Sequence, residues 1–219
     1  MQPRTVTIPE SYRQVATCRA EKRGSTGYLH NTILVHKDFP FEVEEVPVGG
    51  VNITAGCTVP RCAACVVVGS DLTIANVHLC GGRYDDTRYH VLRDVKAKEL
   101  KMLVENANPD IIIGDFNGER SDVFARKTLS KYPMFRDLNK SKKEEFLAYY
   151  MSAHAFLSDN GYVPLYEETD VRQTSVYGGV PDWMYIKKLK LRSILNVQVV
   201  SKCDCSDHSA VVVDIQLKT

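Results

Sequence analysis

The chain has 219 residues, 44% of them hydrophobic, which is enough for one folded unit with a sizeable core. Its 28 Lys and Arg balance 27 Asp and Glu, so a strong global attraction to nucleic acid or to an anionic membrane is excluded, although a local basic patch is not. The apolar runs are too short for a transmembrane segment, and the first residues lack the apolar stretch of a signal peptide.

The seven cysteines are an odd number in a chain long enough to fold without disulfides. We therefore expect an intracellular protein, in the cytoplasm or the nucleus, with most thiols buried as small hydrophobic groups. Cys62 and Cys65, and likewise Cys203 and Cys205, are spaced like pairs of metal ligands. No His pair completes a zinc spacing, so buried thiols are favoured over zinc.

The first half of the chain has the apolar alternation and turn residues that are typical of strands. We predict strands over residues 31–36, 41–48, 63–68 and 72–79. A Gly-Ser-Asp turn predicts that the last two form a hairpin. Between residues 86 and 106 the pattern becomes helical, with Leu92, Val95, Leu100 and Leu103 on one side and charged residues elsewhere.

The second half continues with a strand that begins at Ile111, after Pro109 has ended the helix. Ser121 is a candidate N-cap for a short helix that reaches residue 131, and a longer helix over residues 142–158 ends at Asn160 and Gly161. The last strands are predicted over residues 182–186, 193–200 and 210–217. Many strands with a few helices between them indicate a two-sheet α/β sandwich.

Two polar clusters adjoin buried strands. Asp115 and Asn117 follow the strand that begins at Ile111, and Asp207 and His208 precede the final strand. Strand ends hold side chains rigidly. Asp with Asn suits Mg²⁺ or Mn²⁺, and Asp followed by His suits metal-assisted hydrolysis in which the imidazole moves a proton. The residues indicate a phosphoester hydrolase.

Four motifs occur in the order found in the endonuclease/exonuclease/phosphatase superfamily, the fold of pancreatic deoxyribonuclease. They are Asn76-Val77-His78-Leu79, Gly114-Asp115-Phe116-Asn117, Pro181-Asp182-Trp183-Met184-Tyr185 and Ser206-Asp207-His208. The chain resembles this superfamily from about Tyr12 to its C-terminus. The resemblance implies a two-sheet α/β sandwich and a hydrolase that uses Mg²⁺ or Mn²⁺.

The resemblance also implies roles for the residues of the motifs. Asp115 would orient or activate the attacking water near the metal, and Asp207 would be a metal-side carboxylate. Asn117 would donate a hydrogen bond to a phosphate oxygen in the transition state. His208 would contact the scissile phosphate or transfer a proton, with Asp182 fixing its tautomer.

Three further residues are candidates for the same site. His78 matches the second histidine of the deoxyribonuclease and phosphatase branches of the superfamily. Arg61 matches an arginine that contacts the substrate phosphate in the deoxyribonuclease branch. Arg83, in a loop expected at the rim of the cleft, is a candidate phosphate contact.

The chain departs from the superfamily at its beginning. Members start with a strand that ends in Asn and continue to a strand that ends in Gln-Glu, whose Glu is a principal metal ligand. Neither precedes Tyr12, and Glu10 and Asn52 lie in the wrong context. We therefore expect a single domain over residues 1–219 that lacks its first strand–helix–strand and one metal carboxylate, so that the activity of this chain alone is doubtful.

The expected function is that of a metal-dependent nuclease or nucleic-acid phosphodiesterase in which water attacks phosphorus in line. One alternative is a phosphatase of a phosphoinositide or another small phosphoester. The other is a non-catalytic member of the fold that binds nucleic acid or protein.

Overall fold

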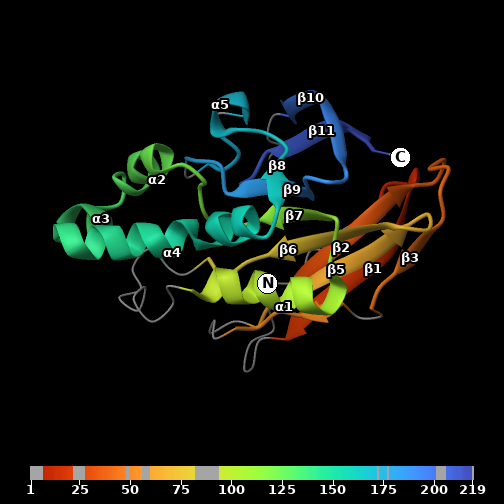
Figure 1. Ribbon diagram of the computed structural model, residues 1–219, viewed down its shortest axis with the longest axis horizontal. Coiled ribbons are helices and arrows are strands. Elements are labelled where there is room, and N and C mark those ends of the chain that lie inside the picture. Colours follow the sequence, from red (N-terminus) through yellow and green to blue (C-terminus); the bar gives the residue numbers. More distant parts are fainter. Residues whose placement is uncertain are drawn as a thin grey trace.

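A computed structural model describes residues 7–21, 28–47, 50–55, 60–81, 94–171, 173–176, 178–200 and 206–218 (Figure 1). Its helices are α1 (Val95–Ala107), α2 (Asp122–Leu129), α3 (Pro133–Asp137), α4 (Lys140–Asp159) and α5 (Glu168–Val171). Its strands are β1 (Tyr12–Glu21), β2 (Tyr28–His36), β3 (Val43–Glu45), β4 (Val51–Asn52), β5 (Cys62–Val68), β6 (Leu72–His78), β7 (Ile111–Asp115), β8 (Tyr162–Pro164), β9 (Asp182–Lys187), β10 (Leu191–Val200) and β11 (Ala210–Leu217).

The main sheet has seven strands in the order β3-β5-β6-β7-β9-β8, and β4 also pairs with β5. The predicted hairpin is confirmed, because β5 and β6 pair antiparallel across the Gly69 turn. β6 and β7 pair parallel, which requires a crossover connection, and α1 lies in that connection. The mixed α/β class predicted from the sequence is therefore correct.

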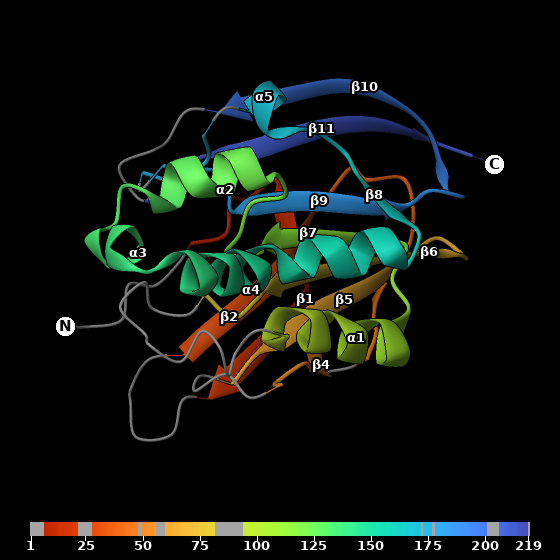
Figure 2. The ribbon, with the colours of Figure 1, turned by 60° about the vertical axis from the view of Figure 1, so that its left-hand side comes forward.

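The remaining strands form two separate two-stranded sheets, β1–β2 and β10–β11. The predicted second sheet is therefore not found as one sheet among the described residues, because its place is taken by two hairpins that do not pair with each other. Figure 2 shows β10 and β11 above the main sheet and β1 and β2 behind it. β1 was not predicted as a strand.

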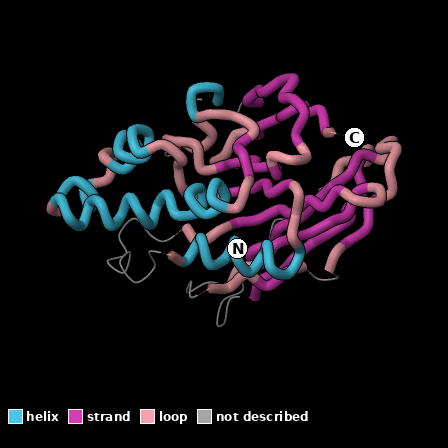
Figure 3. Tube along the Cα trace, in the orientation of Figure 1, coloured by secondary structure: helices cyan, strands magenta, loops and turns pink. Residues whose placement is uncertain are grey.

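The two faces of β5 pack against different layers because successive side chains of a strand alternate in direction. Ala63 and Cys65 belong to the same buried cluster as Leu100 and Leu103 of α1. Cys62, Ala64 and Val66 pack instead against Ala16 and Cys18 of β1. Helix α1 and the β1–β2 hairpin therefore cover opposite faces of the main sheet, and Figure 3 shows the helices gathered to one side of the strands.

The prediction that the cysteines remain free thiols is wrong for three of them. Cys18 and Cys62 form a disulfide that joins β1 to β5, and Cys80 is also disulfide-bonded. Cys65, by contrast, is a free buried cysteine, as predicted. The β1–β2 hairpin is thus linked covalently to the main sheet.

Two predicted helix features also differ in detail. Ser121 precedes α2, but its side chain makes no capping hydrogen bond. In α1, Lys96 and Glu99 are buried with Val95, Leu100 and Leu103, although the sequence pattern placed the charged residues on the other side. In the part of the chain that the structure describes, no helix is both long and apolar enough to cross a membrane.

Candidate active site

The site begins where three neighbouring strands of the main sheet meet. His78 at the end of β6 pairs with Asp115 at the end of β7, and Asp115 pairs with Asp182 at the start of β9. The His78 Nε2 and Asp115 Oδ2 atoms are 3.6 Å apart. The sheet register therefore brings together three of the residues that the sequence analysis selected.

Gly114 allows this close approach. Its φ is +133°, and a Cβ at this position would lie 1.9 Å from the carbonyl oxygen of Val77 on the neighbouring strand. A side chain cannot occupy that space, and a positive φ is strained for any residue that carries one. The glycine of the Gly-Asp-Phe-Asn motif is thus required by the backbone.

Asn117 is fixed in the loop that follows β7. Its backbone N–H donates to Asp115 Oδ1 at 2.8 Å, and its Nδ2 donates to the carbonyl oxygen of Leu79 at 3.0 Å. Its φ of +50° is left-handed, a conformation that Asn tolerates better than most residues. One hydrogen of the side-chain amide is left for another acceptor.

His208 and Asp182 form a close pair. The Nδ1 atom of His208 lies 3.0 and 2.9 Å from the two carboxylate oxygens of Asp182. The hydroxyl of Thr174 donates to Asp182 Oδ2 at 2.7 Å, and the Tyr166 hydroxyl donates to the Asp182 carbonyl oxygen at 2.5 Å. Asp182 is therefore held from three sides, and Nε2 is the imidazole nitrogen that remains available for chemistry.

The segment that carries His208 is held by the segment around Thr174. Ser209 N–H donates to the Thr174 carbonyl oxygen at 2.7 Å, and Val176 N–H donates to the Asp207 carbonyl oxygen at 2.9 Å. Ser175 and His208 form an isolated antiparallel bridge. This strap of residues 174–176 was not recognised in the sequence, because three residues between turns carry no periodic signal.

The charges of the site respond to burial and to each other. Burial, followed by repulsion from Asp182, raises the pKa of Asp115 to about 6. The hydrogen bond with Asp182 raises the pKa of His208 to about 9. Burial, with the positive charges of Arg61 and His208, lowers the pKa of His78 to about 4, so His78 is a neutral imidazole at pH 7.

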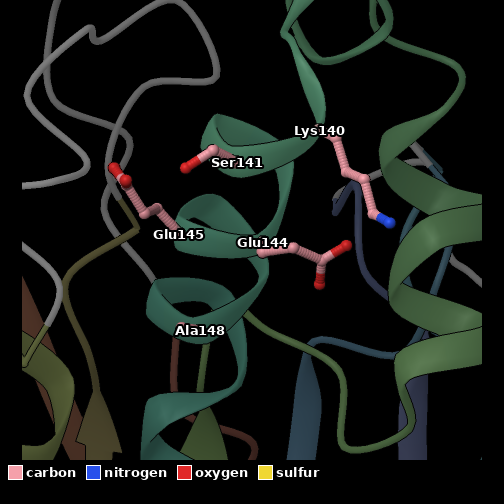
Figure 4. A pocket seen from close by; sticks show the side chains of 5 residues that line it. All are labelled: Lys140, Ser141, Glu144, Glu145 and Ala148. Carbon is pink, nitrogen blue, oxygen red and sulfur yellow. The ribbon is translucent and has the colours of Figure 1, made fainter.

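A pocket of about 320 Å³ joins these groups. It is lined by His78, Asp115, Asn117, Tyr150, Ser175, Gly178, Pro181, Asp207 and His208. A larger hollow of about 600 Å³ lies at the first turns of α4, where Lys140, Ser141, Glu144, Glu145 and Ala148 line it (Figure 4). Glu144 there already binds Arg126 at 2.8 Å, and none of the predicted site residues is present. We therefore assign the candidate site to the smaller pocket.

The structure gathers most of the predicted site residues but not all. Asp182 lies within hydrogen-bond distance of His208. Arg61 is only 8% exposed and does not line the pocket, and its Nε and Nη1 atoms have no hydrogen-bond partner among the described residues. Burial lowers its pKa, while Glu99 and Asp115 oppose that effect. Arg83 lies outside the described residues.

The pocket offers few protein ligands for a metal ion. The described residues contain no cluster of three or more His, Cys, Asp or Glu that could hold an ion. Asp115 and Asp207 nevertheless line the same pocket, and both are hard oxygen donors. Mg²⁺ is commonly bound through one or two carboxylates together with waters and substrate phosphates, so this pair fits a shared Mg²⁺ site but not a protein cage.

Sequence reasoning missed several residues around the site. Tyr150 of α4 lines the pocket, and Thr174 orients Asp182. Lys96 and Glu99 lie on the buried face of α1, and Lys96 contacts the loop that carries Asn117. The signal for the last two was their spacing, because Lys96 lies four residues before Leu100 and Glu99 four residues before Leu103.

No family model and no curated protein matches the sequence. The fold, however, matches solved structures along most of the chain. A 3′ phosphatase, NExo from Neisseria, bound to a product DNA hairpin, matches with a TM-score of 0.57 and 14% identity over 94% of this chain and 80% of that chain.

Two further structures match with a TM-score of 0.50. The endonuclease domain of TRAS1, a telomere-specific non-LTR retrotransposon, is 15% identical, with 96% of this chain and 81% of that chain covered. An endonuclease/exonuclease/phosphatase family protein from Bacteroides thetaiotaomicron is 12% identical, with 94% and 75% covered. The motifs in order and these matches agree: the chain has the fold of the endonuclease/exonuclease/phosphatase superfamily.

Proposed function

We propose that the chain is a metal-dependent phosphoester hydrolase that acts on nucleic acid. The observation that carries this proposal is the His208–Asp182 pair, which opens onto the same pocket as Asp115 and Asn117. The fold is shared with phosphoester hydrolases, one of them bound to a DNA product, and this supports a nucleic-acid substrate. Identities near 14% limit that support to the fold.

The residues suggest a single displacement at phosphorus. Asp115, ionised above about pH 6, accepts a proton from the attacking water as its oxygen bonds to phosphorus. Asn117 donates its free amide hydrogen to a phosphate oxygen as negative charge develops. The P–O bond to the leaving group breaks, and His208 gives the leaving oxygen a proton from Nε2, while Asp182 holds Nδ1.

We propose that Asp115 and Asp207 hold Mg²⁺, or Mn²⁺, when substrate is bound. The ion would neutralise charge on the phosphate and support water in the site. His78 completes the proposed substrate contacts as a neutral donor at the pocket wall. Arg61 is a buried positive charge outside the pocket that interacts electrostatically with Asp115.

The second candidate is a phosphatase of phosphoinositides or other small phosphoesters. The pocket of about 320 Å³ favours it, because that volume is in the range of small-ligand sites. The third candidate is a binding protein without activity, which the small number of metal carboxylates favours. We also propose that residues 1–219 act as one domain in the cytoplasm or the nucleus.

A substrate panel separates the three candidates. Plasmid DNA, structured RNA and a set of phosphoinositides are incubated with the chain, with Mg²⁺ or with EDTA, and products are quantified. Mg²⁺-dependent cleavage of nucleic acid that His208→Ala abolishes, while His36→Ala at an exposed site does not, supports the first candidate. Release of phosphate from lipids alone supports the second, and binding without product in every arm supports the third.

The proposed role of Asp207 in binding Mg²⁺ is tested with a matched control. Asp207→Asn is compared with Asp214→Asn, which changes an exposed carboxylate on the same hairpin. We expect Asp207→Asn to raise the Mg²⁺ concentration that gives half-maximal activity, and Asp214→Asn to leave it unchanged. Equal effects of both would overturn the assignment of Asp207 to the metal.

A further inference from the structure

Lys96 is a fully buried cation next to the candidate site. Its side chain on α1 is 0% exposed. Burying an ammonium group is costly unless its hydrogen bonds are made elsewhere. Because burial of the Lys96 ammonium group costs free energy, we expect its contacts to serve a specific role.

The ammonium group is bound to backbone and to aromatic rings. Its Nζ donates to the carbonyl oxygen of Asn117 at 2.6 Å and to that of Tyr150 at 3.3 Å. It also lies 4.6 Å from the ring centre of Tyr149 and 5.1 Å from that of Tyr150. The shortest of these contacts is with the loop that carries the proposed phosphate donor.

The loop around Asn117 has little freedom beside Lys96. A Cβ on Gly118 would lie 2.2 Å from the Tyr150 carbonyl oxygen, so α4 passes directly against the loop. The Trp183 Nε1 donates to the Gly118 carbonyl oxygen at 3.0 Å. These three contacts come from α1, α4 and β9, and Lys96 supplies the charged one.

We propose that Lys96 is a positioning residue for Asn117. This inference rests on the proposed function, and it extends that function to a residue outside the pocket. The ammonium group donates a hydrogen bond to the Asn117 carbonyl oxygen and holds Asn117 in its left-handed conformation. The side-chain amide of Asn117 then keeps one hydrogen directed to the phosphate. A charge-assisted hydrogen bond is about twice as strong as a neutral one, which suits a lysine to this task.

Burial lowers the pKa of Lys96 to about 7, and Glu99, one turn further along α1, opposes that effect by favouring the charged form. The Glu99 Oε2 accepts from Cys80 N–H at 2.8 Å, which ties this face of α1 to the chain that follows His78.

The kinetic test is a double-mutant cycle between Lys96→Met and Asn117→Ala. Methionine keeps the length and the apolar stem and removes the ammonium group. We expect Lys96→Met to lower kcat about 10- to 100-fold with KM changed less than about 3-fold, because a small misplacement of a catalytic group costs about 100-fold. The double variant should be no slower than Asn117→Ala alone.

The control is Lys101→Met, which changes an exposed lysine of the same helix. It should leave kcat unchanged. Urea melts of every variant establish that the fold is intact, and Lys96→Gln, with a shorter neutral donor, replaces Lys96→Met if the latter does not fold. Rate losses that multiply in the double variant would overturn the proposal, because Lys96 would then act independently of Asn117.

A second readout does not need activity. The Asn117 amide, bound to Asp115 Oδ1, should exchange its hydrogen at least 10-fold faster in Lys96→Met than in the wild type or Lys101→Met. The amide of Ile112 in β7 should exchange at an unchanged rate. If the wild type cleaves no substrate but this pattern holds, the proposed function fails and the role of Lys96 stands. Unchanged exchange at Asn117 overturns the role of Lys96, whatever the activity.

Discussion

Asp115 lies at the end of β7 with a side chain that is 19% exposed, and its carboxylate must be ionised to act on water. Its pKa of about 6, above the ordinary 3.8, means that ionisation at neutral pH costs folding free energy. Function and stability are therefore opposed at this residue.

We predict that Asp115→Asn lowers turnover by several orders of magnitude and raises stability by about 1–3 kcal/mol at pH 8. Asn keeps an acceptor for the Asn117 N–H and carries no charge. The gain should shrink toward pH 4.5, because the wild-type carboxyl is then protonated. Urea denaturation at the two pH values measures it, and a variant that is less stable at pH 8 would contradict the prediction.

The raised pKa values of Asp115 and His208 also predict how activity depends on pH. Asp115 must be deprotonated and His208 protonated, so kcat/KM should rise through about pH 6 and fall through about pH 9. Asp182→Asn removes the partner that raises the His208 pKa. In that variant, the fall of kcat/KM at alkaline pH should move down toward pH 6.5, the ordinary pKa of histidine. An alkaline limb that stays in place would show that another group is responsible.

At the scale of elements, the Cys18–Cys62 disulfide links the β1–β2 hairpin to the main sheet over 44 residues of chain. Loops of this size give a disulfide about 2–4 kcal/mol of stabilisation. We predict that Cys18→Ser with Cys62→Ser, or a reducing agent, lowers the free energy of unfolding by about that amount. Cys65→Ala, at a free buried cysteine, keeps this disulfide, so the reducing agent should destabilise that variant as much as the wild type.

The same disulfide makes the proposed location testable. Disulfides persist in oxidising compartments and are rare in the cytosol. Protein isolated from its native cells under alkylating conditions is digested and analysed by mass spectrometry. Free Cys18 and Cys62 thiols support the intracellular proposal, and an intact Cys18–Cys62 bond overturns it.

The elements best predicted from the sequence were those with a strong local period. The β5–β6 hairpin, β7, α4 and the last three strands were found within a few residues of their true ends, because burial on one or both faces imposes the pattern. β1 was missed because its Arg13 and Gln14 are exposed and interrupt the apolar alternation. Its place is fixed by pairing with β2 and by the disulfide, both of which are tertiary.

The residues of the site also divide into those with a local sequence signal and those placed by tertiary contacts. Asp115, Asn117, His208 and Asp182 were predicted because motifs at strand ends carry their chemistry. Thr174 and Lys96 were not, because each acts through a contact with a residue distant in sequence. Charged residues on a helix are usually exposed, and the position of α1 against the Asn117 loop reverses that expectation for Lys96.

At the scale of the whole molecule, the β10–β11 hairpin has backbone edges that pair with no other described strand. Ile194 and Leu195 of β10 are 41% and 66% exposed. Unpaired edges that carry exposed apolar side chains promote association between chains.

We predict that Leu195→Lys reduces self-association, as measured by static light scattering across a concentration series, with the melting temperature unchanged. The matched control is Val123→Lys, at a residue of α2 that is 72% exposed. An equal improvement from both substitutions would show that total surface hydrophobicity, and not the hairpin edge, drives association.

Gly114 has a consequence for any mutational survey of this protein. A side chain there would meet the Val77 carbonyl oxygen at 1.9 Å, so substitutions should remove folded protein from the cell. Substitutions at the next residue should leave abundance intact and remove only turnover. Gly114 and Asp115 would then score as equally intolerant of substitution in a growth assay, but for different reasons. A parallel measurement of protein abundance distinguishes the backbone requirement at Gly114 from the chemical requirement at Asp115.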